Sequence, residues 1–139
     1  MRPIRKSTVP LLLLFLVGAA ATAGADDIAQ GRAIYLRYCA SCHGRNGEGD
    51  GPMARALTTP PTNLRLLSDL YGNPLEEGKV VRAIDGRAEV KAHGPREMPV
   101  WGERFYVETQ GDELRVQSRI AKLVAYLQSI QTDRRSASR

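Results

Sequence analysis

The most informative stretch of this 139-residue chain is Cys39-Ala40-Ser41-Cys42-His43. Two thiols three positions apart, with an imidazole directly after the second, have the spacing of c-type haem attachment. One helical turn brings side chains at i and i+3 to the same face. Each sulfur can then form a thioether with one vinyl group of a single porphyrin, and His43 can bind the iron through a ring nitrogen. The sequence therefore predicts one covalent haem c, held by Cys39 and Cys42, with His43 as an axial ligand.

Three other interpretations of these residues remain open, although each explains less. A thioredoxin-like C-x-x-C motif needs a βαβ context, whereas the flanking pattern here is helical. A structural zinc site usually needs four Cys or His ligands, and the only further histidine is His93. A disulfide between Cys39 and Cys42 is sterically allowed in an exported protein, but it leaves His43 unexplained.

A second informative stretch, from His93 to Gly102, is a loop flanked by Pro and Gly that contains Met98. A haem iron bound by His on one face needs a sixth ligand, and a Met thioether is a common one. An isolated Met usually fills a core, but Met98 precedes a proline and lies close to Trp101. We therefore predict Met98 as the second axial ligand and Trp101 as a residue of the haem pocket. The rival ligands are His93 and Met53, whose loop would have to wrap around the haem edge.

Between the Cys39–His43 stretch, called the haem motif below, and residue 65 the chain is rich in turn-forming residues. It does not match a phosphate or dinucleotide loop, because no strand precedes it and no Gly-Lys-Ser/Thr follows. We expect this loop to pass along the porphyrin edge, with a carbonyl near Pro52 accepting the other ring N–H of His43. Such a bond would fix the ring and raise its basicity. The alternative is an ordinary surface loop.

The remaining pattern is helical. A first helix is expected to begin at Asp26 or Asp27 and to run to Tyr38, and Gly31 within it predicts a close crossing by another helix near Tyr126. Because Gly in a helix costs about 1 kcal/mol relative to Ala, a packing reason is expected. The other expected helical segments are Ala54–Leu57, Leu66–Tyr71, Asn73–Gly86 with Asn73 as N-cap, and Leu114–Ile130.

The N-terminus has the layout of a secretory signal peptide over residues 1–25. Its parts are a basic start (Arg2, Arg5, Lys6), an apolar run (Val9 to Ala21) and a small-x-small cleavage site (Ala23-Gly24-Ala25). The apolar run is too short to span a bilayer comfortably. We therefore expect export to the periplasm, no stable membrane anchor after cleavage, and a single domain over residues 26–139 with a flexible tail from residue 131.

The formal net charge of +5 overstates the basicity of the folded part. Three positive charges belong to the predicted signal peptide, and Arg134, Arg135 and Arg139 lie in the tail. Setting these six aside leaves a formal charge slightly below zero, so nucleic-acid binding has little support.

These features together resemble class I cytochrome c, and the resemblance covers nearly all of the expected mature chain. The matching parts are Gly31 and Tyr35, the Cys39–His43 motif, Gly49-Asp50-Gly51-Pro52, Met98-Pro99-Val100-Trp101-Gly102, and Leu123-Val124-Ala125-Tyr126-Leu127. The resemblance implies a small all-α fold with crossed N- and C-terminal helices, thioethers from Cys39 and Cys42, and axial ligation by His43 and Met98. The Gly- and Pro-rich loop looks more like bacterial periplasmic cytochromes than the mitochondrial protein.

The first functional interpretation is a periplasmic one-electron carrier rather than an enzyme, exchanging electrons with redox partner proteins such as a dehydrogenase, reductase or oxidase. The second is a cytochrome subunit of a periplasmic oxidoreductase complex. A third, a ligand sensor or peroxidase-like protein, needs an open or displaceable sixth site, which Met98 argues against.

Overall fold

The computed structural model describes residues 20–88 and 98–132, and every regular element within them is helical, which confirms the all-α class. The α-helices are α1 (Ala20–Tyr38), α2 (Ala40–His43), α3 (Leu67–Tyr71), α4 (Glu77–Asp85), α5 (Trp101–Glu108) and α6 (Glu113–Ser129), and the 3-10 turns are η1 (Ala54–Ala56) and η2 (Leu64–Leu66). Among the described residues, no helix has the length and apolar character needed to cross a membrane. His93, residues 133–139 of the predicted tail and the predicted signal peptide up to residue 19 lie outside the described residues. The tail was expected to begin at residue 131, but Gln131 donates to the carbonyl of Leu64 at 2.7 Å and the N–H of Thr132 donates to the carbonyl of Arg65 at 2.9 Å, so these two residues are held against the folded part.

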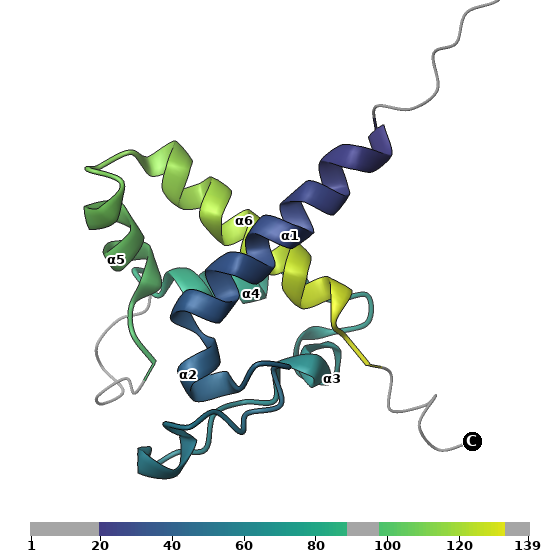
Figure 1. Cartoon of the computed structure of the whole chain (residues 1–139), viewed down its shortest axis with the longest axis vertical. Coiled ribbons are helices and arrows are strands. Elements are labelled where there is room, and N and C mark those ends of the chain that lie inside the picture. Colours follow the sequence, from purple (N-terminus) through teal and green to yellow (C-terminus); the bar gives the residue numbers. More distant parts are fainter. Residues whose placement is uncertain (1–19, 89–97, 133–139) are drawn as a thin grey trace, which may run out of the picture.

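Helices α1 and α6 cross each other near their middles, as Figure 1 shows, and Gly31 lies at the crossing. A Cβ at Gly31 would collide with the backbone carbonyl of Lys122 and would lie 3.0 Å from the Cβ of Tyr126. Only hydrogen fits between the two backbones at this point. The predicted close crossing at Gly31 is therefore confirmed, with Tyr126 beside it.

The core forms where α6 meets α1, α4 and α5. Tyr35 is fully buried, and its ring lies 5.2 Å from that of Tyr126, between their centroids. The apolar stripe expected on the last helix is buried, at Val116, Ile120, Leu123, Val124 and Leu127. The terminal helices thus act as the frame on which the shorter helices and loops are placed.

Two helix starts differ from expectation. Helix α1 begins at Ala20, so Asp26 lies inside it and accepts a hydrogen bond from Gln30 at 2.6 Å rather than capping an end. Helix α4 begins at Glu77 instead of near Asn73, and Glu76 is its N-cap residue. The N–H of Glu76 bonds the carbonyl of Tyr71, which closes a turn between α3 and α4 and delays the start of the helix.

Helix α5 was not expected: Trp101 and Gly102 were assigned to a loop flanked by Pro and Gly, and no element was assigned to residues 103–108. Glu103 lies in its first turn, where a carboxylate favours a helix N-terminus. The end of α4 at Gly86 agrees with expectation: this glycine is left-handed, with φ 68°, and its N–H bonds the carbonyl of Arg82.

Candidate functional site

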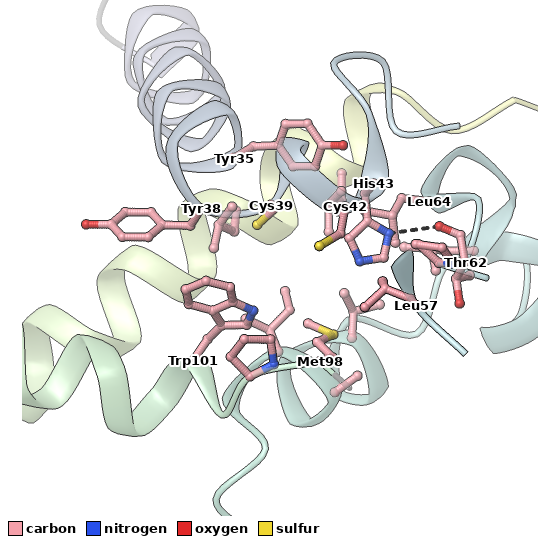
Figure 2. Close-up of a pocket in the computed structure, with 18 of the residues that line it drawn as sticks. Tyr35, Tyr38, Cys39, Cys42, His43, Leu57, Thr62, Leu64, Met98 and Trp101 are labelled. Carbon is pink, nitrogen blue, oxygen red and sulfur yellow. Dashed lines mark hydrogen bonds between the residues drawn. The ribbon is translucent and has the colours of Figure 1, made fainter. Parts of the chain in front are cut away.

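One cavity of about 440 Å³ lies beside the haem motif (Figure 2). Its walls come from the end of α1, α2, residues 57–64, α3, α4, α6 and the segment that enters α5. Most of the lining is apolar, including Leu57, Leu64, Val80, Ile84 and Leu127. Cavity-lining residues also include all four that were predicted as haem attachments or iron ligands, namely Cys39, Cys42, His43 and Met98.

The cysteines reach the cavity because the backbone stays helical from α1 into α2. The N–H of Cys39 bonds the carbonyl of Tyr35 at 2.8 Å, and the N–H of His43 bonds the carbonyl of Cys39 at 2.9 Å. Cys39 and Cys42 are half-buried free thiols, and Figure 2 shows both sulfurs at the cavity wall. Burial, reinforced by the neighbouring Cys42, raises the pKa of the Cys39 thiol to about 12.

His43 is the last residue of α2, and its ring is fixed by the loop that follows. The Nδ1 atom lies 2.9 Å from the carbonyl oxygen of Thr62. Because a carbonyl can only accept, Nδ1 donates this bond and Nε2 keeps its lone pair. Burial lowers the pKa of His43, while the Thr62 carbonyl opposes this shift, so the ring suits a neutral nitrogen ligand.

The expected carbonyl partner of His43 was right in kind but wrong in position. The partner is Thr62, whereas Pro52 is exposed and does not line the cavity. The reason is that the loop folds back on itself: Gly51 bonds the carbonyl of Cys42 through its N–H, which holds Pro52 close to α2 on the outer side. The later segment, from Leu57 to Leu64, supplies the wall instead.

Glycines allow this loop to fold so tightly. The N–H of Gly49 bonds the carbonyl of His43 at 2.9 Å, and its φ of 83° is left-handed. A Cβ at Gly49 would lie 2.5 Å from the carbonyl oxygen of Pro61. Next to Thr62, the side chain of Asn63 accepts a hydrogen bond from the N–H of Arg65 at 3.0 Å and caps η2. The Thr62 carbonyl is therefore presented by a braced backbone.

Met98 lies across the cavity from the haem motif, as Figure 2 shows, and Trp101 lies beside it in the wall. The indole ring is packed against two aromatic neighbours, with centroid distances of 5.6 Å to Tyr38 and 5.9 Å to Phe105. Trp101 therefore lines the cavity, and its place in a haem pocket stays a prediction. Met53 is 50% exposed and is not part of the lining, and His93 is outside the described residues.

Tyr38 is a lining residue that the sequence interpretation did not assign to the site. Its hydroxyl donates to Glu108 at 2.7 Å, and Glu108 also accepts from Arg104 at 2.8 Å and Arg119 at 3.0 Å. The signal was present in the spacing: Tyr38 stands four residues before Cys42, on the same helical face.

The donor set and its surroundings suit a haem. Two thiols one helical turn apart and an oriented imidazole lie on one side, a thioether lies opposite, and the space between is apolar. Across residues 20–88 and 98–132, no group of three or more His, Cys, Asp or Glu side chains is arranged to hold a metal ion.

Comparison with known proteins gives one match. A family model described as "Cytochrome C oxidase, cbb3-type, subunit III" matches residues 26–127, which span both cysteines, His43 and Met98. No curated protein matches the chain, and no solved structure does.

Proposed function

The chain belongs to the family of cytochrome c oxidase, cbb3-type, subunit III, and from this premise we propose that it carries single electrons through one covalently bound haem c. Membership of this cytochrome family implies covalent haem c and electron transfer. The observation that carries the finer proposal is that Cys39, Cys42, His43 and Met98 all line a single apolar cavity.

Each residue has a distinct role in the proposed site. Cys39 and Cys42 would hold the haem through thioethers, and His43 would bind iron through Nε2 while Thr62 holds Nδ1. Met98, on the opposite wall (Figure 2), would supply a thioether ligand. When bound, the haem supplies a one-electron couple, and thioether ligation raises its potential. With His43 and Met98 both engaged, electron exchange would be favoured over substrate chemistry.

A second candidate is a subunit of a periplasmic oxidoreductase complex, and the description of the matching family as an oxidase subunit favours it. The chain would then pass electrons within a stable assembly, whereas a free carrier would make small, transient contacts with its partners. Purification of the tagged protein from detergent-solubilised native cells, with soluble and membrane fractions kept together, separates the two: a stoichiometric partner supports the subunit, and a lone chain supports the carrier.

Export through residues 1–25 is part of the proposal, because c-type haem attachment would then follow in the periplasm. Intact mass of the matured protein should show a chain that begins near Asp26 and carries one haem. A mass that retains residues 1–25 would contradict the proposed signal peptide.

The covalent site is tested by expression with a c-type maturation system, followed by denaturing electrophoresis and haem staining. The wild type and Ser41→Ala should keep haem on the denatured chain, because Ser41 separates the cysteines without lining the cavity. Cys39→Ala combined with Cys42→Ala should lose it. Wild-type protein without covalent haem would refute the proposal, and tight carbon monoxide binding by the reduced protein would favour a ligand-binding role instead.

A further inference from the structure

Arg87 forms ion pairs with two carboxylates, Asp85 and Glu113. Its Nε and Nη2 atoms donate to the two carboxylate oxygens of Asp85 at 2.8 and 2.7 Å. Its Nη1 and Nη2 atoms donate to the two oxygens of Glu113 at 2.9 and 2.8 Å. The guanidinium therefore binds both carboxylates in a bidentate manner, which a lysine ammonium cannot reproduce. We call this arrangement of Arg87 with Asp85 and Glu113 the Arg87 fork.

This fork joins the ends of three helices. Asp85 is the last residue of α4 and Glu113 is the first residue of α6. Gly102, the second residue of α5, is buried against the same group: a Cβ there would collide with Asp85 Oδ1 and lie 2.6 Å from Arg87 Nε. The first turn of α5 thus fits against the fork with no space for a side chain.

The electrostatics support a persistent contact. Hydrogen bonds from Arg87 lower the pKa of Asp85 and that of Glu113, so both carboxylates stay charged. The side chains are 34%, 22% and 43% exposed for Arg87, Asp85 and Glu113, and a single ion pair at such exposure contributes little. Ideal bidentate geometry in a network of three charges is the exception to that rule.

We propose that Arg87 is a positioning residue for Met98, rather than a surface ion pair of general stabilising value. Gly102 follows Met98 by four residues, and Pro99 between them restricts the backbone. Trp101, adjacent to Gly102, lines the cavity (Figure 2). The bonds from Arg87 to Asp85 and Glu113 hold the start of α5 against α4 and α6. They thereby set the distance between Met98 and the opposite wall of the cavity.

This inference rests on the proposed function, because it assumes that Met98 binds the iron. A well-seated Met98 should resist replacement by an added ligand. The test is titration of the ferric holoprotein with imidazole, followed by loss of the Met–iron charge-transfer band. Arg87→Gln and Arg87→Lys should each lower the midpoint concentration about tenfold, a factor that corresponds to about 1.4 kcal/mol. Glu113→Gln keeps the two bonds between Arg87 and Asp85, so it should lower the midpoint imidazole concentration by a smaller factor.

Two controls separate positioning from general stability. Arg115→Gln removes a different ion pair of α6, to Asp112 at 3.0 Å. Ile120→Val weakens the α6 core at a buried residue that is not among those lining the cavity. Both should keep the wild-type imidazole midpoint, even where Ile120→Val unfolds as easily in denaturant as Arg87→Gln.

The outcomes are distinct. Wild-type midpoints in both Arg87 variants would overturn the inference and leave the proposed function intact. An Ile120→Val midpoint lowered as much as that of Arg87→Gln would also overturn it, since the effect would then follow global stability. A wild-type protein with no Met–iron band would refute the proposed ligation, and the positioning role with it.

Discussion

The Nδ1 atom of His43 lies 2.9 Å from the carbonyl oxygen of Thr62, 19 residues further along the chain. This single bond fixes the ring plane and the tautomer, and it directs Nε2 away from the loop. A histidine that donates to a carbonyl is also a more basic ligand. We therefore propose that the loop after the haem motif tunes the iron ligand through its backbone.

Loosening the brace beside Thr62 should weaken its bond to His43. Asn63→Ala removes the cap of η2, which should lower the free energy of unfolding by about 1 kcal/mol. A less firmly held His43 is less basic, so the reduction potential should rise. Asn63→Asp keeps an accepting oxygen and should behave like the wild type. Potentiometric titration of the three proteins checks this, and an unchanged potential in Asn63→Ala would show that Thr62 does not tune the ligand.

Adding a methyl group at the α1–α6 crossing should be costly. In Gly31→Ala the new Cβ would meet the backbone carbonyl of Lys122, which cannot rotate away as a side chain would. We expect a loss of about 2 kcal/mol or more in the free energy of unfolding, measured by denaturant titration. Gly78→Ala is the matched control, because its Cβ would meet only the flexible end of Arg82 at 3.5 Å. It should gain up to about 1 kcal/mol from better helix propensity.

Glu108 should contribute stability that acid removes. Hydrogen bonds from Arg104, and then from Tyr38, lower its pKa from 4.5 to about 2. A depressed carboxyl pKa stabilises the folded state above the unfolded value and loses that contribution as pH falls from about 4.5 towards 2. Because solvent screens these pairs, Glu108→Gln should cost about 1 kcal/mol at pH 7 and only a small part of that at pH 2, where about half of the Glu108 carboxyls in the folded protein are protonated.

Thermal melts across this pH range measure the Glu108 difference, with Glu103→Gln, an exposed carboxylate of the same helix, as the control. A wild-type advantage over Glu108→Gln that was as large at pH 2 as at pH 7 would show that the ion pairs are not its source.

The parts of the site that depend on residue type and spacing could be predicted from the sequence. Cys39, Cys42 and His43 carry their chemistry in their spacing, and Met98 could be placed because a bound iron needs a sixth ligand. Gly31 was informative because glycine is costly in a helix, so its presence implied a close neighbour. The structure places the first four in one cavity and Gly31 at the crossing.

Features made by backbone and by long-range packing were harder to predict. The His43 partner is a main-chain carbonyl, which every residue has, so nothing in the side chain of Thr62 marked it out. Helix α5 contains Gly102 near its start, and only the close fit against Asp85 explains that glycine. Helix α4 starts late because the N–H of Glu76 closes a turn to Tyr71. Each of these depends on a contact that local sequence patterns do not encode.

The central claim is that His43 and Met98 bind one covalent haem from opposite sides of this cavity. The measurement that tests it most directly is the optical spectrum of the matured protein, oxidised and reduced, beside that of Met98→Ala. The account predicts a covalent haem with a Met–iron charge-transfer band in the oxidised wild type, lost in Met98→Ala with a lower reduction potential. A band that survives in Met98→Ala, or covalent haem with no such band in the wild type, would contradict it.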